Sequence, residues 1–118
     1  MAAITARQPF LGGEEAEWIS RERARLDSIL IRALDCLSEI WLQNGEPSLA
    51  LGAARESVAM EPYRETGYQR LMRIHVALGN RAEALRVYES CRLLFAEELG
   101  SDPSPETQKI YAELLCPS

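Results

Sequence analysis

His75 is the only histidine of this chain, and histidine is the side chain best suited to acid–base chemistry near neutral pH. Catalysis by histidine needs a nucleophile or a second titratable group within hydrogen-bond reach. His75 lies instead in an apolar helical pattern between Leu71 and Leu78. We therefore expect it to pack in the core, and a single histidine also excludes a metal site built on a histidine pair.

Paired carboxylates and phosphate-binding loops give no better candidates for chemistry. Glu14 and Glu15 are adjacent, as are Glu97 and Glu98, so on a helix the two members of each pair point about 100° apart. The glycine pair at positions 12–13 is not followed by the Gly-Lys-Ser/Thr of a phosphate-binding loop. The sequence therefore predicts that the chain is not an enzyme and binds no cofactor.

The three cysteines, Cys36, Cys91 and Cys116, do not form a recognisable metal or disulfide pattern. Their number is odd, and none of them has the C-x2-C spacing of a zinc site. Cys36 and Cys91 fall within helical apolar patterns, so we expect both to be buried as small hydrophobic side chains. Cys116 lies close to the C-terminus, where we expect it to be exposed.

The composition narrows the classes of partner. The chain has 118 residues, 47% of them hydrophobic and 26% charged, with a net charge of −5. A nucleic-acid surface would show a basic stripe, so we expect no direct binding to DNA. No apolar run approaches the roughly 18 residues that span a bilayer, and the first residues do not resemble a signal peptide. We expect a cytoplasmic protein without membrane contact.

The chain repeats itself at a spacing of 34 residues. The recurring pairs are Gly45 and Gly79, Ala50 and Ala84, Leu37 and Leu71, and Leu51 and Leu85. This period is the length of a tetratricopeptide (TPR) unit, a pair of antiparallel helices that stacks on its neighbour to bury its apolar face. The alanines occupy the positions where paired helices approach closely. The pattern predicts an all-α, TPR-like repeat.

Start and stop signals divide the chain into a tail at 1–13 and one helical domain at 14–116. Expected helices span about 15–44, 47–60, 64–78, 80–99 and 105–115. Gly79 is suited to a helix C-cap, Asn80 with Glu83 resembles a capping box, and Ser104 is expected to cap the last helix. The expected architecture is two antiparallel helix pairs plus a C-terminal capping helix.

Several local strings, taken in order, resemble one protein family. They are Phe10-Leu11 ahead of Trp18, RARL at 23–26, MEPYRE at 60–65, GNRAEAL at 79–85 and, most specific, LFAEELGSDPSPET at 94–107. In this order they resemble the bacterial transcriptional activator domain over about residues 9–115. In that family the helical module follows a winged-helix DNA-binding domain, as in the SARP-type antibiotic regulatory activators.

The resemblance implies a regulatory module that supports transcriptional activation through protein contacts. The implied partners are the winged helix of a parent regulator, RNA polymerase or a second copy, with DNA reached only through the parent protein. We identify no winged helix in this sequence, and we expect the chain to be either an excised domain or a truncated or stand-alone relative. The alternative is a generic TPR adaptor or scaffold unrelated to transcription, and the closing string at 94–107 argues against it.

Two sets of candidate partner-binding residues follow. Phe10, Leu11 and Trp18 are large apolar side chains in a polar entry segment, and we expect them to dock the DNA-binding domain or to cap the domain's own core. We expect Leu34, Leu37 and Trp41 to point inward. The opposite side of the same helix and its 34-residue repeat is then either an ordinary solvated face or, as the resemblance to TPR stacks implies, a partner-binding groove. The expected groove residues are Arg32, Asp35, Glu39, Gln43, Gln69 and Arg73.

Overall fold

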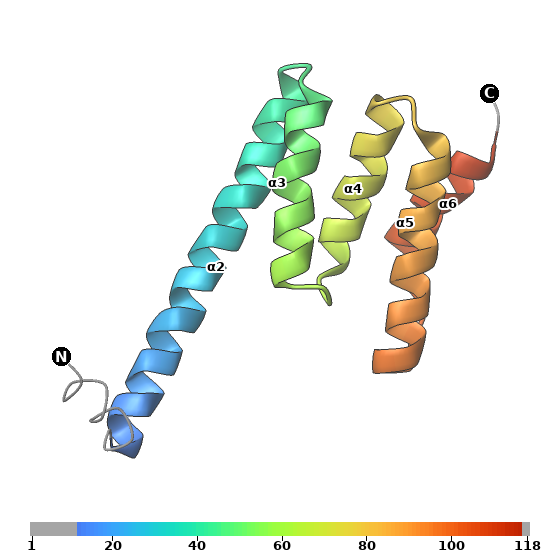
Figure 1. Cartoon of the computed structure of the whole chain (residues 1–118). Coiled ribbons are helices and arrows are strands. Elements are labelled where there is room, and N and C mark those ends of the chain that lie inside the picture. Colours follow the sequence, from blue (N-terminus) through green and yellow to red (C-terminus); the bar gives the residue numbers. More distant parts are fainter. Residues whose placement is uncertain (1–11, 117–118) are drawn as a thin grey trace. The chain divides into compact units, whose positions relative to one another are not determined.

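The structure, a computed structural model, describes residues 12–116 and is helical throughout its regular elements (Figure 1). The helices are α2 (Gly13–Gln43), α3 (Pro47–Met60), α4 (Glu65–Ala77), α5 (Arg81–Leu94), the π-helical segment η2 (Phe95–Leu99) and α6 (Pro105–Leu115). Their order and type confirm the predicted all-α, TPR-like fold. None of the helices in this described part is long and apolar enough to cross a membrane.

Local sequence signals set most of the helix limits. Gly45, Gly79 and Gly100 have φ values of 77°, 74° and 63°, a left-handed conformation that glycine adopts without the clash of a Cβ atom. Pro47 begins α3 because the first turn of a helix needs no backbone N–H donor at that position. The side chain of Asn80 accepts a hydrogen bond from the backbone N–H of Glu83, which confirms the predicted cap of α5.

Two helix limits and one helix cap differ from the prediction. α2 begins at Gly13, earlier than expected, and α5 gives way to a π-helical turn at Phe95 instead of continuing regularly. Ser104 lies at the N-cap of α6, but its side chain makes no capping hydrogen bond. Its backbone N–H instead donates to the carboxylate of Glu65, at a nitrogen-to-oxygen distance of 2.6 Å. The start of α6 is therefore held in place by Glu65 of α4.

The chain divides into two units, residues 1–30 and residues 31–118. The described part of the first unit is the beginning of α2, whose side chains are exposed except for the half-buried Glu22. The second unit holds the end of α2 and all later helices. In it α3, α4 and α5 run in alternating directions, and α6 packs against α4 and α5 (Figure 1).

The core of the second unit lies between successive helices. Ala50 and Ala54 of α3 pack with Leu71 and Ile74 of α4. A second group joins α4, α5 and α6, and a third joins α4 to α5 and to the start of η2. The second is Met72, Ala84, Tyr88 and Leu114, and the third is Tyr68, Cys91 and Phe95. Each helix pair therefore buries its apolar face on the next, as the repeat predicts.

The inward face of α2 is rotated relative to the prediction. Its buried residues are Ile31, Leu34 and Ser38, whereas Leu37 exposes 44% of its surface, so the prediction that Leu37 points inward was wrong. The small side chain of Ser38 takes that place, and its hydroxyl donates to the backbone oxygen of Asp35 at 2.9 Å. The same rotation exposes Cys36, which was expected to be buried.

We expect Ala84→Leu to lower the free energy of unfolding by about 1–3 kcal/mol. Ala84 is completely buried where α5 meets α4 and α6, so extra methylene groups must displace Met72 or Tyr88. Urea denaturation monitored by circular dichroism measures the change. The control is Ala82→Leu, the same substitution at an exposed position of the same helix, which we expect to stay within about 0.5 kcal/mol. Equal stabilities for the two variants would contradict the close packing.

Candidate protein-interaction site

Two of the predicted groove residues, Asp35 and Glu39, bind arginines of the same chain. The Asp35 carboxylate accepts hydrogen bonds from Arg64 at 2.6 Å and from Arg70 at 3.1 Å. Arg70 also donates from its Nε to Glu39 at 2.9 Å. The hydroxyl of Ser57 on α3 donates to the Oδ1 atom of Asp35 at 2.7 Å, and Arg70 binds the same oxygen. The result is a polar network that ties the end of α2 to α3, to α4 and to the turn before α4.

The electrostatics of this network favour the charged form of Asp35. Burial by itself would raise the pKa of the carboxyl group, since it removes water from the charge. The hydrogen bonds from Arg64 and Ser57 and the positive charge of Arg70 act in the opposite direction and prevail. The pKa of Asp35 therefore lies below its usual value, and this carboxyl group remains ionised at neutral pH.

A second polar group involves Gln69, the predicted groove residue at the start of α4. Its side-chain amide donates to the hydroxyl of Thr107 on α6 at 2.8 Å. The Thr107 hydroxyl in turn donates to Glu65, which also accepts the backbone N–H of Ser104. Burial raises the pKa of Glu65, but the hydrogen bonds from Ser104 and Thr107 outweigh it and lower the pKa overall. Glu65 and Gln69 thus hold the first turn of α6 against α4.

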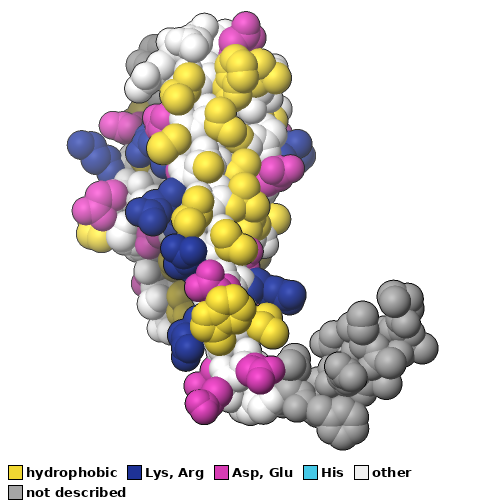
Figure 2. Space-filling view, turned by 90° about the vertical axis from the view of Figure 1, so that its left-hand side faces the viewer, with side chains coloured by type: hydrophobic (Ala, Val, Ile, Leu, Met, Phe, Trp, Pro, Cys, Tyr) yellow, Lys and Arg dark blue, Asp and Glu magenta, His cyan; other side chains and the backbone are white. Residues whose placement is uncertain are grey.

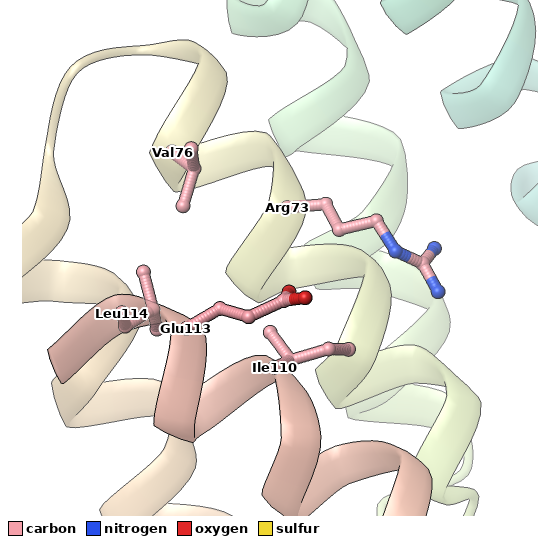
Figure 3. A pocket seen from close by; sticks show the side chains of 5 residues that line it. All are labelled: Arg73, Val76, Ile110, Glu113 and Leu114. Carbon is pink, nitrogen blue, oxygen red and sulfur yellow. The ribbon is translucent and has the colours of Figure 1, made fainter. Parts of the chain in front are cut away.

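The remaining predicted groove residues, Arg32, Gln43 and Arg73, are exposed. Arg73 lies at a cavity of about 290 Å³ between α4 and α6, which it lines together with Val76, Ile110, Glu113 and Leu114 (Figure 3). The close-up shows the guanidinium group of Arg73 directed away from the apolar side chains of this cavity (Figure 3). Of the six predicted residues, three are therefore engaged within the chain and three are open to solvent.

The three predicted docking residues lie at the beginning of the chain. Phe10 and Leu11 are outside the described residues. Trp18 exposes 58% of its surface. Apolar side chains gather along α2 (Figure 2). The exposed large ones in the first unit, here called the α2 apolar face, are Trp18, Ile19, Leu26, Ile29 and Leu30.

Two groups that could support catalysis, His75 and Cys91, lie in the core. His75 is 3% exposed, as predicted, and burial lowers the pKa of its imidazole, which favours the neutral form. Its Nδ1 atom has no hydrogen-bond partner among the residues that the structure describes. Cys91 is fully buried, and burial together with the charge of Glu65 raises the pKa of its thiol to about 11. Between residues 12 and 116, no cluster of three or more His, Cys, Asp or Glu side chains could hold a metal ion.

Sequence reasoning did not single out the partners of these polar groups. Arg64 and Glu65 belong to the string at 60–65, and Thr107 ends the string at 94–107, so the signal was present in the family resemblance. Nothing in the spacing connects them, because 42 residues separate Glu65 from Thr107. The structure shows that these two strings are joined by hydrogen bonds.

Comparison with known proteins gives the family. The model of the bacterial transcriptional activator domain matches residues 5–115, nearly the whole chain. The chain belongs to this family. The match confirms the resemblance seen in the strings at 60–65, 79–85 and 94–107, and it disfavours a generic TPR adaptor. No solved structure matches this activator domain.

Its relatives are much longer regulators. Regulatory protein AfsR of Streptomyces coelicolor is 31% identical over 105 residues, which cover 89% of this domain and 11% of the relative. Regulatory protein AfsR of Streptomyces griseus is 32% identical over 98 residues, which cover 83% of this domain and 10% of the relative. Transcriptional regulatory protein MoaR1 of Mycobacterium tuberculosis is 29% identical over 79 residues, covering 67% and 25%. The chain thus spans between a tenth and a quarter of these relatives.

Proposed function

We propose that this activator domain is the protein–protein interaction module of a bacterial transcription regulator and supports activation without catalysis of its own. The observation that carries the proposal is the α2 apolar face, in a family whose relatives include a transcriptional regulatory protein. Large exposed apolar surfaces on proteins mark sites that another surface covers. The net charge of −5 disfavours DNA as that surface, since phosphate binding depends on Lys and Arg.

The arrangement of the α2 apolar face suits docking of another folded domain. At about 100° per residue, Trp18, Ile29 and Leu30 fall within roughly a third of the helix circumference, and Ile19 and Leu26 lie between them. Aromatic anchors such as Trp18 contribute strongly to interfaces because they bury a large area with few rotatable bonds. We propose that the winged-helix domain of the parent regulator covers this face and that Phe10 and Leu11 take part in the same docking.

We propose a separate role for the predicted groove residues of the second unit. Arg32, Gln43 and Arg73 are exposed and can contact a partner such as RNA polymerase or a second copy. Asp35, Glu39 and Gln69 contribute by fixing the helices that present these side chains, because they bond to Arg64, Arg70 and Thr107. This division assigns recognition to the exposed residues and positioning to the bonded ones.

The test removes the two most exposed side chains of the α2 apolar face in the parent regulator, with Trp18→Ala and Leu26→Ala together. Both side chains are more than half exposed, so we expect the free energy of unfolding to change by about 1 kcal/mol or less. Transcription from the target promoter should fall several-fold, as measured with a reporter, while promoter binding persists. Leu49→Ala is the control, since Leu49 of α3 is similarly exposed but lies outside this face. Normal transcription by the double variant would count against the proposed docking.

A further inference from the structure

Three neighbouring cavities lie along α6. The cavity of about 290 Å³ beside Arg73 shares Val76, Glu113 and Leu114 with a second one of about 310 Å³, which reaches Arg81 and Cys116. A third, of about 360 Å³, shares Glu113 and Cys116. Neighbouring cavities share lining residues, and the three together are here called the α6 groove. It belongs entirely to the second unit.

The floor of the α6 groove is apolar. Val76 of α4 exposes 49% of its surface, while Ile110 of α6 is half-buried and Leu114 is buried. Figure 3 shows these three side chains approaching the same space from two helices. Leu114 packs on Met72, Ala84 and Tyr88, so the floor rests on the core and presents a fixed shape. Such a surface accepts apolar side chains without rearrangement of the domain.

The rim of the α6 groove is cationic, in contrast to the chain as a whole. Arg73, Arg81 and Lys109 line it, and no described carboxylate lies within ion-pair distance of any of them. Other arginines of the second unit, such as Arg86 and Arg92, pair with glutamates of their own helix. Glu113 is the one carboxylate among the lining residues described for these cavities. The groove therefore carries a local excess of positive charge on a chain of net charge −5.

This combination selects the chemistry of the occupant. We propose that the α6 groove binds an acidic amphipathic helix of a protein partner, with apolar side chains on Val76, Ile110 and Leu114 and carboxylates paired with Arg73 and Arg81. An amphipathic helix laid in an apolar groove is a common recognition mode, and charges on the rim set its orientation and its specificity. The N-terminal segment 1–11 lacks this chemistry, since it has one arginine and no carboxylate. The inference rests on the proposed role as an interaction module and names the partner class for one surface.

The test titrates the isotope-labelled full chain with a synthetic helical peptide that carries leucines at amphipathic spacing and glutamates on its remaining positions. The control peptide has lysine in place of every glutamate. We expect the glutamate peptide to shift the amide resonances of α6 and of the end of α4, and the lysine peptide to leave them unchanged. Equal binding of both peptides, shifts confined to other helices, or no binding at millimolar concentration would each overturn the proposal.

A pair of variants tests the rim. Arg73→Glu with Arg81→Glu should lower the affinity for the glutamate peptide about tenfold or more, because two attractive contacts become repulsive. The matched control is Arg23→Glu with Arg55→Glu, which reverses two exposed arginines that also lack a described ion-pair partner and line none of these cavities. We expect the control to weaken binding by about threefold at most at physiological ionic strength. If both pairs of substitutions weaken peptide binding equally, the effect comes from the net charge of the chain alone, and the proposal is overturned.

Sedimentation of the chain alone distinguishes the remaining occupant. If the chain self-associates and Arg73→Glu with Arg81→Glu abolishes this, the occupant of the α6 groove is a second copy of the chain, and the proposed acidic partner is wrong. The two proposals fail separately. Normal transcription by the Trp18→Ala and Leu26→Ala variant contradicts the α2 docking function and leaves the peptide result intact, whereas loss of peptide selectivity contradicts only the α6 groove.

Discussion

We expect Asp35→Ala to lower the free energy of unfolding by about 2–4 kcal/mol. The Asp35 side chain is 14% exposed and accepts hydrogen bonds from Arg64, Arg70 and Ser57. Its removal leaves Arg64 without a carboxylate partner and Arg70, which is 15% exposed, with Glu39 alone. A charged group that loses its partner in a partly buried site contributes an unfavourable desolvation free energy, so the cost exceeds that of an exposed ion pair.

Urea denaturation of the full chain at neutral pH measures this cost. Asp27→Ala is the control, because Asp27 lies on the same helix, is exposed and has no described bonding partner, and we expect a change within about 0.5 kcal/mol. The pH dependence gives a second measurement. Since the folded-state pKa of Asp35 lies below its usual value of 3.8, its stabilisation is fully present above that value and is lost as the pH falls through the folded pKa. The difference from Asp35→Asn should therefore shrink on acidification, and a difference independent of pH would contradict the network.

We expect Glu65→Ala to lower the free energy of unfolding by about 2–3 kcal/mol and to loosen α6 in particular. The Glu65 carboxylate accepts both the backbone N–H of Ser104 and the hydroxyl of Thr107, and the Thr107 side chain is completely buried. After the substitution these two donors lose their acceptor in a place that water reaches poorly. Among the described residues of α4, Gln69 is then the one side chain that still forms a hydrogen bond with the first turn of α6.

Hydrogen exchange separates this local effect from a general loss of stability. Amide protons of α6 should exchange faster in Glu65→Ala by a larger factor than those of α3 and α4. Glu56→Ala is the control, because Glu56 of α3 is exposed and has no described bonding partner. Uniform acceleration in all helices would show that Glu65 does not act through α6. Since α6 forms one wall of the α6 groove, Glu65→Ala should also lower the affinity of the chain for the glutamate peptide.

The elements of the fold could be predicted from local sequence. The limits of α3 and α6 agree with prediction at both ends, because Pro47 and Pro105 start these helices and turn signals follow them. Gly79 and the Asn80 cap were predicted for the same reason, since turn and cap geometry depends on neighbouring residues. The 34-residue period predicted which faces pack, and the burial of Ala50 and Ala84 confirms it.

The surfaces depended on the tertiary structure. A helical pattern defines an apolar arc but not its edge, so Leu37 and Cys36 were assigned to the core although α2 buries Ser38 in that place. Asp35 and Glu39 could not be recognised as bonded residues, because their arginines lie about one repeat away in the sequence. Whether a charge on a helix is free for a partner depends on which side chains the next helix brings within hydrogen-bond distance. Only the packing of α4 and α6 decided that, leaving Arg73 exposed while Gln69 is held by Thr107.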